Sequence, residues 1–140
     1  MVRLIEKIPS LTGLEVIYPI HPRTKNKLEK FGLKFSNVKL TEPLGYIDFL
    51  KLQMHANMVV TDSGGIQEEA CILGVPCITI RENTERPETL DVGSNKLVGL
   101  DIDELEKAID YHTNHKTQWE NPFGNGKTSE KIIEVIESHL

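Results

Sequence analysis

The 140-residue chain has little of several features that mark specialised classes of protein. No apolar run approaches the ~20 residues that a membrane-spanning helix needs, and the opening residues MVRLIEKIPS lack the apolar core of a signal peptide. The net charge is −5, whereas broad nucleic-acid binding requires a basic surface. We therefore expect neither a membrane nor a nucleic acid as a partner, and an anionic ligand would have to be held by local geometry.

Cysteine is also scarce, with only two residues in the chain. Cys71 and Cys77 both lie in apolar segments, so we expect two buried thiols rather than a disulfide. Unpaired thiols suit a reducing compartment, which favours a cytoplasmic location. Asn-x-Ser/Thr sequons are absent as well, so the sequence offers no sign of secretion.

What is present has the composition of one globular domain, with 39% hydrophobic and 26% charged residues. Five short apolar runs predict strands covered on both faces, at residues 15–18, 38–40, 58–61, 77–80 and 96–98. Helical patterns accompany them at residues 2–8, 24–31, 46–55, 65–73, 102–112 and 129–139. Strands that alternate with helices indicate an α/β fold, a Rossmann-like three-layer domain with a parallel sheet. A helix at residues 2–8 should follow an earlier strand, and none is present.

The most informative stretch is VVTDSGGIQEEACILGVP, at residues 59–76. It puts Ser63, Gly64 and Gly65 at the start of a helix that follows a strand, where free backbone N–H groups and the helix dipole favour an anion. Without Cβ atoms, the two glycines would let a phosphate oxygen approach the backbone. The equally weighted alternative is a plain Ser63 N-cap followed by turn glycines.

Two further groups lie at the same predicted edge of the sheet. Glu69 stands one helical turn after Gly65, where a carboxylate could accept hydrogen bonds from ribose hydroxyls, or it could be an ordinary surface residue. Arg81 and Arg86 follow the fourth strand and could supply positive charge. Thr84–Glu88 also reads as a helix start with Pro87 near its first position.

Metal chemistry is not predicted. His112 and His115 are three residues apart on one helix, but no cysteine or third ligand accompanies them. The pattern favours a solvated helix end over a metal site.

Several segments taken together resemble one family, the non-hydrolysing UDP-N-acetylglucosamine 2-epimerases. They are YPIHPRT (18–24), EPLGYIDFLKL (42–52), TDSGGIQEEA (61–70), RENTERPE (81–88) and NPFGNG (121–126). The resemblance implies the C-terminal half of a GT-B fold, spanning residues 1–140, that binds UDP-GlcNAc or UDP. It further implies an isomerase that interconverts UDP-GlcNAc and UDP-ManNAc by elimination and re-addition of UDP, needs no cofactor, and serves cell-envelope polysaccharide biosynthesis.

The resemblance also implies roles for individual residues. Ser63, Gly64 and Gly65 would hold the diphosphate, Glu69 the ribose, and Arg86 the phosphate or sugar. Leu44 and Phe49 would border the uracil, although Phe49 could equally be a core aromatic. His21 corresponds to a histidine of a regulatory UDP-GlcNAc site in some relatives, or it could be a turn residue before Pro22.

The resemblance leaves out the N-terminal half of the family fold. That half would carry the catalytic carboxylates, so no catalytic residue is expected in this chain. The strand that opens the C-terminal half is also missing, and it would lie at the centre of the sheet, between residues 15–18 and 58–61. We expect a truncated product or a fragment that needs the N-terminal domain or a second chain, and full-length relatives are expected to be homodimers. A non-catalytic UDP-sugar-binding module and half of a GT-B glycosyltransferase remain as alternatives.

Overall fold

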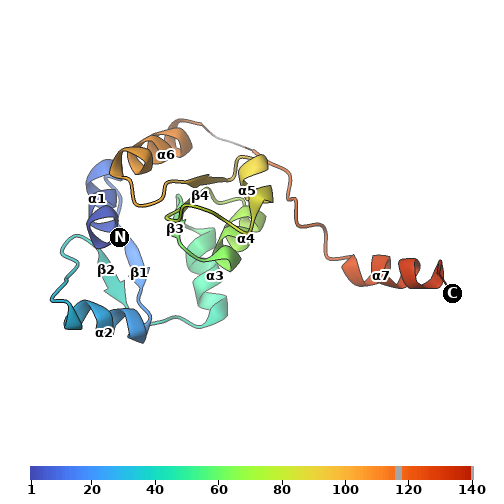
Figure 1. Cartoon of the computed structure of the whole chain (residues 1–140), viewed down its shortest axis with the longest axis horizontal. Coiled ribbons are helices and arrows are strands. Elements are labelled where there is room, and N and C mark those ends of the chain that lie inside the picture. Colours follow the sequence, from blue (N-terminus) through green and yellow to red (C-terminus); the bar gives the residue numbers. More distant parts are fainter. Residues whose placement is uncertain (116–117, 140) are drawn as a thin grey trace.

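The structure, a computed structural model, describes residues 1–115 and 118–139 of the chain. Helices and strands alternate along most of the sequence (Figure 1). In chain order they are α1 (Val2–Thr12), β1 (Ile17–Pro19), α2 (Pro22–Lys30), β2 (Lys39–Thr41), α3 (Tyr46–Met54), β3 (Val59–Thr61), α4 (Gly64–Leu73), β4 (Cys77–Thr79), α5 (Pro87–Asp91), β5 (Asn95–Leu97), α6 (Ile102–Asn114) and α7 (Thr128–Glu137).

The five strands form two separate parallel sheets. In one, β1 pairs with β2, and Ile17 lies opposite Lys39. In the other, the order is β3-β4-β5, with Val59 opposite Cys77 and Cys77 opposite Asn95. The break falls between β1 and β3, where the sequence predicts a missing strand. The expected α/β class with parallel pairing is confirmed, but as two sheets rather than one continuous sheet.

The central strand β4 separates two different layers. Because side chains alternate along a strand, Ile78 and Ile80 join an apolar core with Leu4 of α1 and Leu105 of α6. On the opposite side, the Thr79 hydroxyl donates to Asn95 Oδ1 at 2.8 Å, within a polar network that reaches α4. One face of the sheet is therefore held by hydrophobic burial, and the other combines buried apolar residues of α4 with a hydrogen-bonded network.

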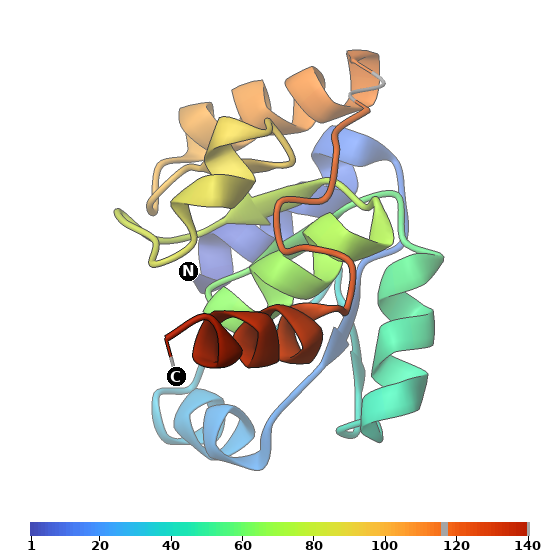
Figure 2. The ribbon, with the colours of Figure 1, turned by 90° about the vertical axis from the view of Figure 1, so that its right-hand side faces the viewer.

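The last helix lies apart from both sheets. Figure 1 shows α7 at the end of an extended segment that leaves the body of the fold, and in Figure 2, where that side faces the viewer, α7 lies in front of the body. Before it leaves, the Trp119 indole N–H donates to the Cys71 carbonyl at 2.9 Å, which fixes the start of this segment against α4. The apolar side chains of α7, Ile132, Ile133, Val135 and Ile136, are all exposed.

The predicted elements are confirmed, although α1 continues through Pro9 to Thr12, beyond its predicted end at residue 8. Each strand lies within two residues of its predicted bounds, and Pro87 begins α5 as the helix-start pattern indicates. Cys71 and Cys77 are free and buried, as expected. Burial raises the pKa of the Cys77 thiol to about 12, which keeps it protonated and unreactive at neutral pH. In the part of the chain that the structure describes, no helix is both long and apolar enough to cross a membrane.

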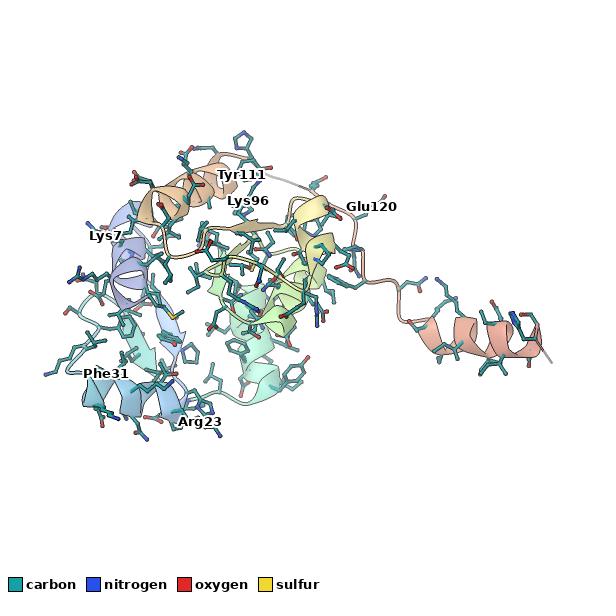
Figure 3. All side chains as sticks on the ribbon, in the orientation of Figure 1. Lys7, Arg23, Phe31, Lys96, Tyr111 and Glu120 are labelled. Carbon is teal, nitrogen blue, oxygen red and sulfur yellow. The ribbon has the colours of Figure 1, made fainter. Side chains whose placement is uncertain are left out.

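His112 gives the fold a specific sensitivity to pH. The prediction of a solvated helix end is wrong for this residue, because its side chain in α6 is 7% exposed and Nε2 lies 3.2 Å from the Cys77 carbonyl oxygen. Burial lowers the pKa of His112 below its usual value, and the nearby positive charge of Lys96 adds to the effect. Lys96 itself lies over the Tyr111 ring, 4.1 Å from its centroid (Figure 3).

We predict that the free energy of unfolding falls as the pH drops below the unfolded-state pKa of about 6.5, because the unfolded chain then binds a proton that folded His112 resists. His112→Gln keeps a donor for the Cys77 carbonyl but cannot titrate, so its stability should change less between pH 7.5 and pH 5. Urea unfolding at both pH values measures the difference. Equal losses in the parent and the variant would contradict this assignment.

Candidate functional site

The amino end of α4 presents unpaired backbone donors. Ser63 is the N-cap, and the first intrahelical bond runs from the Gln67 N–H to the Ser63 carbonyl at 3.2 Å. The N–H groups of residues 64–66 precede this bond, so the helix itself gives them no acceptor. Together with the helix dipole they form a place where an anion is stabilised.

Ser63 contributes a hydroxyl rather than an amide to this end of the helix. Its N–H donates to Thr61 Oγ1 at 3.0 Å, so that donor is already used. Its hydroxyl makes no cap hydrogen bond to α4 within the described chain. If Ser63 served only as an N-cap, its hydroxyl would accept a hydrogen bond from an N–H of the first turn of α4. The Ser63 hydroxyl is therefore free to contact a ligand beside the amides of residues 64–66.

The glycine pair is not explained by turn geometry. Gly64 and Gly65 are helical residues of α4, and neither has a positive φ. A Cβ atom on Gly65 would meet nothing within 4 Å, and one on Gly64 would meet only the ends of Glu85 and Arg86, the nearest atom at 3.5 Å. Glycine in a helix costs up to about 1 kcal/mol relative to alanine. No backbone angle or close contact in the described fold requires glycine at these two positions, so nothing within the fold offsets this cost.

The loop after β4 brings charged side chains to the same place. Arg86 forms an ion pair with Glu68 of α4 through Nε, and its Nη1 donates to the Glu85 carbonyl at 2.9 Å. Arg81 Nη2 lies 3.2 Å from Glu85 Oε1. Both arginines thus have carboxylate partners, and the site carries no large excess of positive charge. Arg86 Nη2 makes no hydrogen bond with any described residue and remains available.

Buried polar side chains fix this loop to α4. Gln67 is fully buried, and its Oε1 accepts from Thr84 Oγ1 at 2.5 Å and from Asn95 Nδ2 at 3.2 Å. Thr84 Oγ1 in turn accepts from the Arg86 N–H at 3.0 Å. A second Asn95 bond reaches Thr89 Oγ1 of α5 at 3.0 Å. The position of Arg86 over the start of α4 is therefore set by a hydrogen-bonded network beneath it.

Glu69 points toward α3 rather than toward the arginines. Its Oε2 accepts from Gln53 Nε2 at 2.6 Å. Gln53 is 3% exposed, so the carboxylate of Glu69 is held by a donor that is itself fixed by packing. Glu68, and not Glu69, is the carboxylate that pairs with Arg86.

Leu44 and Phe49 lie at the start of α3, after β2. Leu44 is 41% exposed and immediately precedes the N-cap Gly45. Phe49 is half-buried and is not a member of the main hydrophobic core. Helix α3 packs against α4, where Gln53 contacts Glu69. Phe49 and Glu69 therefore belong to one pair of packed helices, and Leu44 lies just before the first of them.

His21 lies at a different place, at the end of β1. It is the N-cap of α2, and its Nδ1 accepts from the Arg23 N–H at 3.2 Å. This contact gives His21 the structural role of a capping residue. Among residues 1–115 and 118–139, no group of three or more His, Cys, Asp or Glu side chains is placed to hold a metal ion.

Three supporting residues are not predicted from the sequence: Gln53, Gln67 and Thr84. All three are uncharged polar residues. Gln53 and Gln67 lie in predicted helices and Thr84 lies in a loop, and the distances between them along the sequence match no known motif. The only signal is a glutamine at a position where the helical period expects an apolar side chain.

Comparison with known proteins relates nearly all of the chain to one family. Residues 1–137 match the family described as UDP-N-acetylglucosamine 2-epimerase. The chain is 52% identical over 126 residues to the UDP-N-acetylglucosamine 2-epimerase of Methanocaldococcus jannaschii, an alignment that covers 86% of this chain and 34% of the relative. It is 47% identical over 141 residues to the enzyme of the same name from Methanococcus maripaludis, covering 97% of this chain and 38% of that protein.

Solved structures agree with the sequence comparison. A crystal structure of Methanocaldococcus jannaschii UDP-GlcNAc 2-epimerase in complex with UDP-GlcNAc and UDP superposes with a TM-score of 0.88 and 48% identity. The match covers 98% of this chain and 39% of that chain, and it corresponds to the C-terminal half of the GT-B fold. The present chain therefore spans well under half the length of the relatives it matches.

We predict that Gly65→Ala raises the free energy of unfolding by up to about 1 kcal/mol, since the new methyl group meets no neighbour and alanine favours the helix. Gly74→Ala is the matched control at the other end of α4. It also has open space, but its φ of 74° should make alanine destabilising. Chemical denaturation measures both. A loss of stability in Gly65→Ala would show that the fold itself needs this glycine.

Proposed function

This chain belongs to the UDP-N-acetylglucosamine 2-epimerase family, and we propose that it is the C-terminal, UDP-binding domain of such an enzyme over residues 1–140. The observation that carries the proposal is the pair of helical glycines at the start of α4. Neither the backbone angles nor the packing of the described chain requires them. Close approach of a ligand oxygen to the helix amides accounts for both.

The diphosphate of UDP is the group that this end of α4 suits best. The N–H groups of residues 64–66 and the Ser63 hydroxyl would donate to its oxygens, and Arg86 would contribute through Nη2. Hydrogen bonds to a charged acceptor contribute about 1.5–3 kcal/mol each. Since both local arginines already face carboxylates, these directed donors would matter more than the net charge of the site.

The nucleoside would lie along α3 and α4. Glu69 would accept hydrogen bonds from the ribose hydroxyls, with its orientation fixed by the 2.6 Å bond from Gln53. Leu44 and Phe49, at the start of α3, would border the uracil. Half-buried Phe49, outside the main core, fits this role better than that of a core aromatic.

The reaction we propose for the complete enzyme is the interconversion of UDP-GlcNAc and UDP-ManNAc. UDP leaves by elimination, the proton at C2 of the sugar is replaced on the other face, and UDP adds back. The donors at α4 would stabilise the negative charge that develops on the leaving diphosphate. The groups that move the C2 proton would come from the part of the family fold that this chain does not span, so this chain would have no catalytic residue of its own.

Several broader assignments belong to the same proposal. The domain would act with the N-terminal half of the fold or a second chain, in an enzyme that is a homodimer in its full-length form. It would act in the cytoplasm, in cell-envelope polysaccharide biosynthesis. A second, regulatory UDP-GlcNAc at His21 would have to compete with the cap that His21 forms on α2.

Calorimetric titration with UDP tests the binding site. We expect the parent chain to bind UDP and Gly65→Ala to bind it at least about tenfold more weakly, because the methyl group occupies the space of a phosphate oxygen. Uridine, which lacks the diphosphate, should bind weakly to both proteins. Equal UDP affinity for the parent and Gly65→Ala would remove the main support for the site.

An activity assay tests the division of roles. The 140-residue chain should show no conversion of UDP-GlcNAc to UDP-ManNAc, while it still binds UDP. Turnover close to that of a full-length relative would refute the assignment of the catalytic groups to the other half. UDP binding without turnover in the presence of that half would instead favour a non-catalytic UDP-sugar-binding module.

A further inference from the structure

The start of α4 has carboxylates beside it as well as donors. Glu68 is four residues after Gly64 in the same helix, so its side chain lies one turn further along the same face. Glu85 approaches from the loop after β4, and its Oε2 would lie 3.5 Å from a Cβ atom on Gly64. A place that suits a diphosphate is therefore bordered by two negative charges of the protein, which oppose an anion rather than attract it.

Arg86 lies beside both the Glu68 carboxylate and the first residue of α4. Its Nε is buried and faces Glu68 in the ion pair, and its Cζ would lie 3.9 Å from a Cβ atom on Gly64. Nη1 donates to the Glu85 carbonyl at 2.9 Å. The same guanidinium thus contacts a carboxylate through Nε and borders the proposed position of the phosphate at Gly64.

Glu68 is not needed to hold the loop that carries Arg86. The Arg86 N–H donates to Thr84 Oγ1 at 3.0 Å, and the Thr84 hydroxyl donates to the buried Gln67 at 2.5 Å. The Glu68 and Arg86 side chains are 35% and 34% exposed, so their charges are screened less than those of a fully exposed pair. The carboxylate therefore neutralises Arg86 at a place where neutral groups already position its backbone.

Two ligands of this site differ by one charge. When UDP leaves the sugar, the C1–O bond breaks and its electron pair stays on the terminal phosphate. That phosphate then has a second ionisable oxygen with a pKa of about 6. Near neutral pH it carries about one negative charge more than the same phosphate in a UDP-sugar. A fixed carboxylate nearby raises the free energy of the more highly charged ligand by the larger amount.

We propose that Glu68 is a specificity-determining residue that lowers the affinity of the site for free UDP more than its affinity for a UDP-sugar. This inference rests on the function proposed above. Because Glu68 neutralises Arg86, the directed donors at residues 63–66 provide the main attraction for the diphosphate. In the complete enzyme, the leaving group is then held by hydrogen bonds and is not trapped by excess positive charge, so it can add back to the sugar.

Calorimetric titration of the 140-residue chain with UDP and with UDP-GlcNAc tests the proposal. Glu68→Gln keeps an acceptor for Arg86 Nε but removes the negative charge. At low ionic strength and neutral pH, we expect this substitution to raise the affinity for UDP at least about threefold more than the affinity for UDP-GlcNAc. Contacts to the sugar cancel, because each ligand is compared between the parent and the variant.

Two further variants and a change of salt serve as controls. Glu68→Asp keeps the charge and should retain the preference of the parent chain. Glu106→Gln removes an exposed carboxylate of α6, which packs on the face of the sheet opposite α4, and should leave both affinities unchanged. At about 1 M salt, where the Debye length is about 3 Å, the effect of Glu68→Gln should largely disappear.

An equal change in both affinities, or weaker binding of both ligands by Glu68→Gln, would overturn the proposal, because Glu68 would then act only by orienting Arg86. The same change of preference in Glu68→Asp and Glu68→Gln would also overturn it, since the charge would then not matter. All these outcomes include UDP binding by the parent chain. A parent chain that binds no UDP would instead refute the proposed UDP site itself, and this inference with it.

Discussion

The buried side-chain amide of Gln67 holds the candidate site together. It accepts hydrogen bonds from Thr84, in the loop after β4, and from Asn95, in β5, while its own helix carries the donors at residues 64–66. Losing a partner in such a place leaves a buried polar group unsatisfied, at a cost of about 1–3 kcal/mol. The charged residue Arg86 is thereby positioned over the start of α4 by neutral groups that no ligand needs to touch.

The overall order of elements could be predicted from the sequence because it depends on local patterns. Short continuous apolar runs predicted the strands, and the helical spacing of apolar residues between them predicted most of the helices. The start of α4 was also predictable, since Ser-Gly-Gly between an apolar run and a helical pattern marks the point where the helix begins. The hydrogen-bonded layer beneath it was not, because Gln67 lies 17 residues from Thr84 and 28 from Asn95, in no recognisable spacing. Only the tertiary fold brings them together.

Glu68 and Glu69 also show that contacts made by the tertiary fold could not be predicted from the sequence. Helical spacing put Glu69 one turn after Gly65, but it carries no information about which side chains of other segments face a glutamate of this helix. The folded chain pairs Glu68 with Arg86 and Glu69 with Gln53, since the neighbours of each carboxylate come from other segments. The break between the sheets was predictable for a different reason: the resemblance to a longer family indicated a strand that the chain does not contain. The candidate diphosphate site and the break between the two sheets are linked through β3. This strand lies at the break and leads directly into the start of α4.

The central claim is that the amides at the start of α4 receive a diphosphate. Titration of the ¹⁵N-labelled chain with UDP, followed by two-dimensional NMR, tests it at single residues. The account predicts that the amide signals of Gly64, Gly65 and Ile66 shift together and saturably, with larger changes than any signal of α6. Shifts confined to other parts of the chain, or none at UDP concentrations that saturate a relative of this family, would contradict it.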